Sequence, residues 1–250
     1  MKIIHIKTKK VRVKPKANFT DWIVSSCQAS ENKLRNGDII IISSKILSYF
    51  ENMVLDLSKI KISEKSKDIA KKMNTKPELI EIVLQEADEV IAETKWVLLT
   101  KKNGIYCANA GVDLSNVPKG YAVLWPKDPF MSARTIAKEL KKKLNLRKLG
   151  IIIADSACSP GRAGTTSVAI GYYGVKGYED LKGKEDLFKN KLRYSALNLV
   201  DSLATAANLI MGESKERTPL AIIREYKWTE YKNTKKDEMN IPSSEDLYQI

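Results

Sequence analysis

The sequence predicts an α+β fold, with strands and helices alternating along one chain of 250 residues. Two observations carry the prediction. Short apolar runs bounded by turn residues alternate with longer segments of helical periodicity, and Lys102-Asn103-Gly104 lies between two strand-like runs, which is a good hairpin signal. Because a hairpin pairs its strands antiparallel, we expect mixed or antiparallel sheets and not a purely parallel, doubly wound sheet.

Local patterns predict the elements of the first half. The run DIIIIS after Asn36-Gly37 is apolar almost without interruption and predicts a buried strand over 38–43. Pro77 stands in the first turn of a helix expected over 77–93, whose apolar residues keep mostly to one face. The other expected strands are 2–7, 96–100, 105–108 and 121–125, and the other expected helices are 18–30 and 63–73.

The second half continues the alternation. Asp128-Pro129 predicts a helix start, with the acid as N-cap, and this helix is expected to run to about Leu144. The strongest helical periodicity spans 194–211, where Gly212 follows as a cap. Strands are expected at 150–154, 168–171 and 220–224. We therefore expect one domain over 1–226, followed by a polar, flexible tail over 227–250.

The chain is strongly basic, with a net charge of +13 and a pI of about 9.4. Such a surface suits anionic partners, including nucleotides, polycarboxylates, nucleic acids and membranes, although lysines on solvated faces would give the same charge. Aromatic residues do not interleave with the basic clusters, so nucleic acid is not an expected partner. The sequence has no apolar run of membrane-spanning length and no signal-peptide centre, so we expect no membrane partner and a cytoplasmic location.

Several familiar sites are absent from the sequence. It contains neither G-x-x-x-x-G-K-[ST] nor G-x-G-x-x-G, the phosphate-binding loops of common nucleotide-binding folds. The single histidine, His5, sits in a strand pattern and has no nucleophile elbow to accompany it, so a Ser-His-Asp triad is not expected. The three cysteines form no C-x-x-C pair, which indicates neither a disulfide framework nor a zinc site.

Four short segments instead combine acids, hydroxyls or a lysine with small residues. They contain Asp113 and Asn116 in CANAGVDLSN, Asp155 and Ser156 after the apolar run IIIA, Glu213 after Gly212, and Ser44 and Lys45 after DIIII. We expect Asp155 to end its strand and to be left uncovered by small neighbours. Each segment has an ordinary alternative, such as an Asx-turn at Asp113 or a solvated glutamate at a helix end. Together they suit Mg²⁺ or Mn²⁺ beside a polyphosphate.

Three blocks of the chain resemble a known family. ANAGVDLSN, the run D-S…P-x-R-x-G-x-x-x-V-A-I-G, and MGE before TPLAIIR stand in the order and spacing of the coenzyme F420-0:L-glutamate ligase family, from residue 3 to about 224. The resemblance implies a two-lobed α+β protein that forms an intertwined homodimer. It also implies a ligase that adds L-glutamate through a γ-linked amide to an acceptor carboxylate, using GTP or ATP and a divalent metal ion.

The resemblance further implies roles for individual residues. Metal-binding positions of the family fall on Asp113, Asp155, Ser156 and Glu213. Nucleotide-binding positions fall on Ser44, Lys45, Asn116, Met211, Gly212, Ser214 and Thr218, and another such segment matches residues 10–13. In the expected mechanism the γ-phosphoryl group passes to the acceptor carboxylate, and the amine of glutamate attacks the acyl phosphate. Asp155 helps to hold the metal, while Lys45 and Arg162 offset charge on the phosphoryl oxygens.

Two departures from the family pattern leave the acceptor open. Tyr49 stands where the family commonly has a second lysine, and Cys158-Ser159 stand where it commonly has Gly-Arg. The run LWPKDP at 124–129, together with D-S-x-C-x-P-x-R-x-G, looks more like a branch proposed to glutamylate folates. The expected acceptor is therefore coenzyme F420-0 or a folate. The alternative is a catalytically inactive paralogue that still binds nucleotide and metal.

Overall fold

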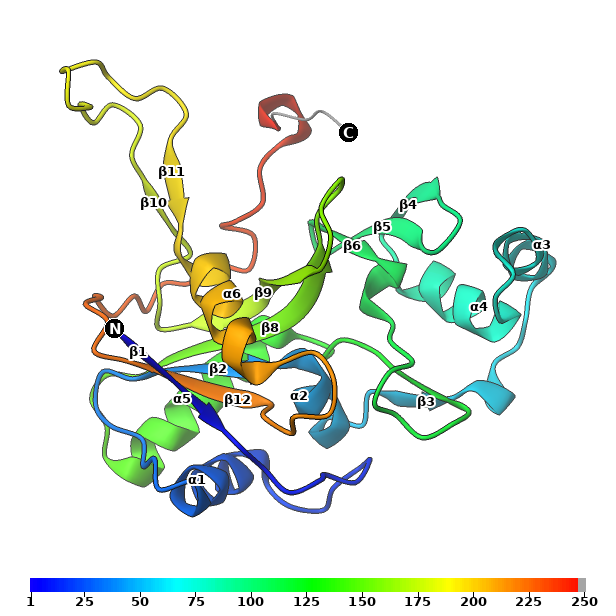
Figure 1. The fold of residues 1–250 in the computed structure, drawn as a ribbon, viewed down its shortest axis with the longest axis horizontal. Helices are drawn as coiled ribbons and strands as arrows, with labels where there is room; N and C mark the ends of the chain where they lie inside the picture. The colour runs from blue at the N-terminus through cyan, green and yellow to red at the C-terminus, as the bar shows by residue number, and fades with distance from the viewer. Residues whose placement is uncertain (247–250) are drawn as a thin grey trace.

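The computed structural model describes residues 1–246 and has an α+β fold (Figure 1). Its main sheet has five strands in the order β1-β12-β2-β8-β9. Their bounds are β1 Lys2–Ile6, β12 Leu220–Arg224, β2 Ile39–Ser43, β8 Gly150–Cys158 and β9 Thr165–Tyr173. Strands β2 and β8 pair parallel while the other neighbours pair antiparallel, which confirms the predicted α+β class with mixed sheets.

Helices cover both faces of this sheet. Ile40 and Ile42 of β2 share a core with residues of α1 (Phe19–Ala29) and α5 (Pro129–Leu144). Ile39 and Ile41 share a second core with residues of α6 (Leu199–Met211), and all four isoleucines are fully buried. A strand covered on both faces reads as a continuous apolar run, which is why DIIIIS shows no alternation.

The segment from 44 to 128 forms the second part of the fold. In order it contains α2 Ser44–Phe50, β3 Val54–Asp56, α3 Glu64–Met73, α4 Pro77–Glu86, β4 Glu89–Glu93, β5 Leu98–Lys102, β6 Ile105–Ala108 and β7 Tyr121–Val123. Strands β4, β5 and β6 form an antiparallel sheet, and β3 pairs with β7. The predicted hairpin is confirmed, since Asn103 and Gly104 both have positive φ, as a type I′ turn requires.

Two predicted helices are shorter than expected because strand pairing competes with them. The helix expected over 77–93 ends at Glu86, and the residues that follow form β4, whose backbone bonds to β5. The helix expected over 194–211 begins at Leu199, because β11 (Ala196–Asn198) pairs with β10 (Tyr178–Asp180). Both pairings are tertiary contacts, so the helical periodicity of the sequence does not reveal them.

Strand β8 is longer than predicted, and this changes the position of Asp155. The sequence predicts strands at 150–154 and 168–171, whereas β8 and β9 extend further and pair along most of their length. Asp155 pairs with Val168 inside this ladder, so the expectation that it ends the strand is wrong. Pairing continues beyond the apolar run because β-branched threonines at the start of β9 still suit an extended strand.

The polar C-terminal segment contacts the body of the fold at several points. The Trp228 indole donates to the Gly37 carbonyl over 2.9 Å, and the Tyr172 hydroxyl donates to Glu238 over 2.6 Å. The segment predicted as a flexible tail over 227–250 therefore makes specific contacts in its described part, and its last four residues lie outside the described ones. Among the described residues, no helix combines the length and the apolar character needed to cross a membrane.

Removing the Trp228 side chain is expected to destabilise the protein. Trp228→Ala deletes the bond to Gly37 and the contact with Lys148, whose ammonium lies 4.1 Å from the ring centre. We expect the free energy of unfolding to fall by about 1–3 kcal/mol, measured by urea denaturation. Trp96→Ala is the matched control, because Trp96 is 79% exposed and its loss should leave the midpoint unchanged. Equal midpoints for both variants would mean that this segment adds no stability.

Candidate functional site

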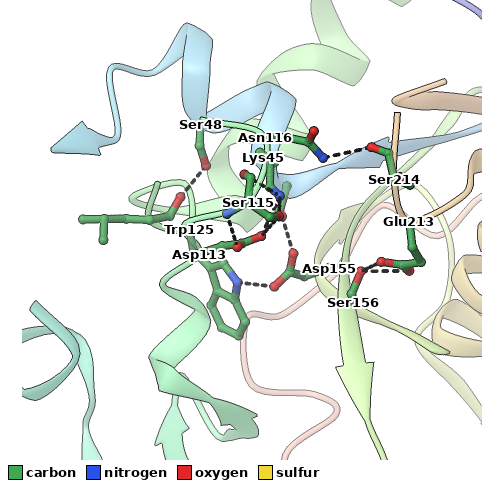
Figure 2. A network of polar contacts seen from close by, with 12 residues as sticks. Lys45, Ser48, Asp113, Ser115, Asn116, Trp125, Asp155, Ser156, Glu213 and Ser214 are labelled. Atoms are coloured by element: carbon green, nitrogen blue, oxygen red, sulfur yellow. Dashed lines mark hydrogen bonds and ion pairs between the residues drawn. The ribbon is translucent and has the colours of Figure 1, made fainter. Parts of the chain in front are cut away.

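A pocket of about 590 Å³ lies where the main sheet meets the segment 44–128. Its lining comes mainly from residues within 8–11, 43–49, 108–116 and 211–219, together with the middle of β8. Figure 2 shows polar side chains from these distant stretches meeting in one network. A volume of this size is typical of small-molecule sites.

Most of the predicted site residues line this pocket. They are Lys45, Asn116, Met211, Gly212, Ser214 and Thr218 from the predicted nucleotide set, and Asp113, Asp155, Ser156 and Glu213 from the predicted metal set. Ser44 is not in the lining, but its hydroxyl donates to Asp155. Arg162 is exposed in the turn between β8 and β9 and does not line the pocket. The structure thus brings Lys45 to the predicted acids and leaves Arg162 away from them.

Lys45 and Asp113 form an ion pair at the start of α2. The Lys45 ammonium donates to Asp113 Oδ2 over 2.5 Å and to the Ser115 hydroxyl over 2.7 Å. The Ser115 amide donates to Asp113 Oδ1 over 2.6 Å, which is the Asx-turn considered as the alternative for this acid. Partial burial by itself would raise the pKa of Asp113, but the Lys45 charge and the Ser115 donors outweigh burial and lower that pKa.

Asp155 receives one donor on each carboxylate oxygen. The Ser44 hydroxyl donates to Oδ1 and the Trp125 indole donates to Oδ2, each over 2.6 Å. Burial raises the pKa of Asp155 even though both donors favour the ionised form. The expectation that small neighbours leave this acid uncovered is therefore wrong, because side chains from α2 and from the segment after β7 reach it.

The end of α6 supplies the third acid. Glu213 follows Gly212, which ends the helix with a positive φ, and accepts from the Ser156 hydroxyl over 2.8 Å and from the Asn208 amide over 2.8 Å. The Asn116 amide donates to the backbone carbonyl of the next residue, Ser214, over 3.0 Å. These bonds tie the loop after α6 to both β8 and the loop that carries Asp113.

The acids fit a divalent cation in chemistry but do not form a ready-made metal site. Carboxylate and hydroxyl oxygens are the donors that Mg²⁺ and Mn²⁺ prefer. Within residues 1–246, however, no group of three or more histidine, cysteine, aspartate or glutamate side chains is arranged to hold a metal ion. Asp113, Asp155 and Glu213 line one pocket, and each is engaged by donors of the protein itself.

Cations surround these acids in the pocket wall. The basic residues of the lining are Lys9, Lys10, Lys45, Lys215 and Arg217. They come from the N-terminal segment, from α2 and from the loop after α6, so positive charge faces the pocket from three sides. Several ammonium and guanidinium groups around carboxylates suit a polyanion bound together with a cation.

Three residues that matter for the geometry have no predicted role. The Tyr49 hydroxyl donates to the Asn116 carbonyl over 2.5 Å, and burial, with a smaller effect of Asp113, raises the pKa of Tyr49. Trp125 bonds to Asp155 from outside the pocket lining. Gly111 has a φ of +71°, and a Cβ there would overlap the Trp125 indole. The sequence does single out Tyr49, the block around Gly111 and the run that contains Trp125, but not these contacts.

Comparison with known proteins gives consistent matches over most of the chain. Residues 6–225 match the family described as F420-0:Gamma-glutamyl ligase. The Coenzyme F420:L-glutamate ligase of Methanocaldococcus jannaschii is 38% identical over 216 residues, which are 86% of each chain. The enzyme of the same name from Methanothermobacter thermautotrophicus is 37% identical over 82% of each chain. That of Methanopyrus kandleri is 34% identical over 85% of this chain and 82% of its own.

Proposed function

The chain belongs to the F420-0:gamma-glutamyl ligase family, and on that basis we propose that it is a nucleotide-dependent γ-glutamyl ligase. In this proposal it joins the amine of L-glutamate to an acceptor carboxylate of coenzyme F420-0 or of a folate. Its named relatives are ligases, so the formation of a carbon–nitrogen bond is the shared activity. The observation that carries the proposal is that one pocket is lined by Lys45 and by three acids from separate parts of the chain, of which Asp113 pairs with Lys45.

We assign the nucleotide, GTP or ATP, to the basic part of this pocket. Lys45, Asn116, Ser214 and Thr218 would contact it, with Ser44 behind them. The volume suits such a ligand, and the Lys45 ammonium is placed to offset charge on phosphate oxygens. Arg162, predicted for the same task, is exposed on the β8–β9 turn and receives no role here.

Asp113, Asp155, Ser156 and Glu213 would hold Mg²⁺ or Mn²⁺ when the nucleotide is bound. A bound divalent ion would supply neutralisation of the phosphate charge. If Asp113 exchanged its bond to the Lys45 ammonium for the metal ion, Lys45 would be free to meet the phosphates. The ion pair between Lys45 and Asp113 therefore fits the state of the protein before nucleotide and metal bind.

The proposed reaction has two chemical steps. An oxygen of the acceptor carboxylate attacks the γ-phosphorus, and the bond between that phosphorus and the nucleoside diphosphate breaks. The glutamate amine then attacks the carbonyl carbon of the acyl phosphate, loses a proton, and displaces inorganic phosphate. Lys45 stabilises the negative charge that spreads over the phosphoryl oxygens.

An assay of each combination of metal ion, nucleotide and acceptor tests the proposal directly. Purified protein is incubated with Mg²⁺ or Mn²⁺, GTP or ATP, L-glutamate, and either coenzyme F420-0 or a folate, and product masses are measured. We expect a glutamylated product and an equal amount of released phosphate for one acceptor. Nucleotide binding without product or phosphate release for every acceptor would favour the inactive paralogue, for which Tyr49 at the usual lysine position is the motivating observation.

The proposal includes an intertwined homodimer of two-lobed protomers, with residues 1–226 as one domain. The two lobes would be the main sheet with α1, α5 and α6, and the segment around α3 and α4, which buries its own apolar cluster. The β10–β11 arm projects from the body (Figure 1), and it carries Leu187, Phe188 and Tyr194 at 98%, 85% and 83% exposure. Exposed apolar side chains of this kind favour contact with a second subunit.

Polar substitution on the arm is expected to weaken the dimer. Light scattering after size-exclusion chromatography should give a dimer for the wild type and a larger monomer fraction for the double variant Leu187→Ser and Phe188→Ser. Trp96→Ser, which removes an equally exposed aromatic from the β4–β5 turn, is the control and should leave the dimer intact. A wild type that is monomeric at all concentrations would contradict this part of the proposal.

A further inference from the structure

We propose that Trp125 is a positioning residue for the Asp155 carboxylate, acting from outside the pocket through its indole N–H. The inference rests on the proposed function, because it gives Trp125 a role in preparing Asp155 for the metal ion. Trp125 lies in the run LWPKDP after β7, is 3% exposed and does not line the pocket. Figure 2 shows its indole directed at Asp155.

The two donors on Asp155 fix the plane of its carboxylate. Trp125 Nε1 lies 2.6 Å from Oδ2, and Ser44 Oγ lies 2.6 Å from Oδ1. Each carboxylate oxygen accepts two hydrogen bonds or ligands, so each keeps one acceptor direction. Because the donors belong to different segments of the chain, rotation of the carboxylate would break at least one bond. The free acceptor directions are thereby held in place.

The Trp125 indole is held in place by groups around it. Gly111 leaves the space that the ring occupies, since a Cβ at this position would overlap the indole. On the backbone side, the buried Ser48 hydroxyl donates to the Leu124 carbonyl over 2.6 Å and fixes the residue before Trp125. Gly111, in the block ANAGVDLSN, therefore affects Asp155 indirectly by leaving room for the Trp125 indole. This contact connects two motifs that lie far apart in the sequence.

A part-buried ion pair lies against one side of the ring. The Lys102 ammonium lies 5.5 Å from the Trp125 ring centre and pairs with Glu86 over 2.6 Å. Lys102 is only 8% exposed, so its attraction to the π-face is weakly screened by water. The chain of contacts from Glu86 through Lys102 and Trp125 to Asp155 joins α4 and β5 to the pocket.

The substitution Trp125→Phe separates positioning from packing. Phenylalanine retains an aromatic ring in the core and removes the N–H donor. The protein is titrated with Mn²⁺ in the presence of a non-hydrolysable GTP analogue, with free Mn²⁺ measured by electron paramagnetic resonance, and kcat and KM for glutamate are measured separately. Because the loss of an outer partner typically costs about 10–100-fold in metal affinity or activity, we expect Mn²⁺ affinity and kcat to fall by that factor. The KM for glutamate should stay within about twofold.

Two further variants serve as controls. One removes an indole elsewhere in the protein, and the other is used if Trp125→Phe does not fold. Trp96→Phe makes the same change at an exposed tryptophan and should change neither Mn²⁺ affinity nor kcat. If Trp125→Phe fails to fold, β-(3-benzothienyl)alanine incorporated at position 125 replaces the N–H by sulfur with almost no change of shape, and it should reproduce the loss of Mn²⁺ affinity.

Three outcomes are decisive. A folded variant without the N–H whose Mn²⁺ affinity and kcat stay within twofold of wild type would overturn the inference. A wild type that binds no Mn²⁺ would overturn both the metal assignment and the role of Trp125. A wild type that binds Mn²⁺ but makes no product with any acceptor would defeat the proposed ligase activity, while the Mn²⁺ titration would still support or refute Trp125.

Discussion

Replacing Asp155 by asparagine is expected to lower the turnover of glutamate ligation by at least about 100-fold. This loss is larger than that expected for removing a hydrogen-bond partner of a metal ligand, because Asp155 itself would be the ligand. Asparagine nearly conserves the volume of the side chain but removes the negative charge that would face the metal ion. It also replaces one oxygen by an amide that cannot accept from Ser44 or Trp125. The measurement is kcat at saturating nucleotide, glutamate and acceptor.

The same substitution should also change how the stability of the metal-free protein depends on pH. Burial raises the pKa of Asp155 above its ordinary value. Above about pH 3.9, the ordinary aspartate pKa, ionisation of this group therefore disfavours folding, and below that pH the effect disappears. Asp155→Asn removes this penalty but also loses a bond to Ser44 or Trp125, so we expect its stability relative to wild type to fall as the pH is lowered toward ~4. Urea denaturation at several pH values measures this.

Asp201→Asn is the matched control for this prediction. Asp201 is another part-buried acid with a raised pKa caused by burial, but it accepts from the Ala169 amide over 2.8 Å and lies outside the pocket lining. Its substitution should change the pH dependence of stability in the same direction and leave kcat unchanged. If Asp155→Asn kept full ligase activity, or if both variants lost activity equally, the assignment of Asp155 to the metal site would be wrong.

Arg224→Met is expected to produce the largest loss of stability, about 3–5 kcal/mol in the free energy of unfolding. Asp38 is 1% exposed and accepts from Arg224 Nε over 2.9 Å and from Nη2 over 2.8 Å. The Asp38 hydrogen bond is the largest cause of the raised pKa of Arg224. Removing the guanidinium leaves an uncompensated buried carboxylate, which is costly because water cannot reach it. Urea denaturation gives the free energy.

Two further variants identify the cause of that loss. Glu225→Gln breaks the neighbouring Lys2–Glu225 pair, whose side chains are 66% and 56% exposed, and should not shift the midpoint measurably. The double variant Arg224→Met and Asp38→Asn removes both charges and should be less unstable than Arg224→Met alone. A double variant at least as unstable as the sum of the single losses would contradict the buried-charge explanation.

Elements whose stability comes from nearby residues could be predicted from the sequence. The strand DIIIIS, the N-cap Asp128, which accepts from the Met131 amide over 2.9 Å, and the Asn103-Gly104 turn all appear where they are expected. Elements that depend on a partner strand could not. β4 replaces the end of a predicted helix, and β8 continues past the predicted strand end, because each gains backbone bonds from a strand that local periodicity does not reveal.

Most of the polar residues that line the pocket could be singled out in the sequence, because acids, a lysine and hydroxyls next to small residues are unusual enough to mark a candidate site. The hydrogen-bond and ion-pair partners of these residues could not be predicted from the sequence. Whether Asp155 is bare or bonded, whether Lys45 faces phosphate or Asp113, and whether Arg162 reaches the pocket depend on contacts between segments distant along the chain. Only the folded structure decides such contacts, since burial removes water as a competing partner and leaves each polar group the donors and acceptors that packing places beside it.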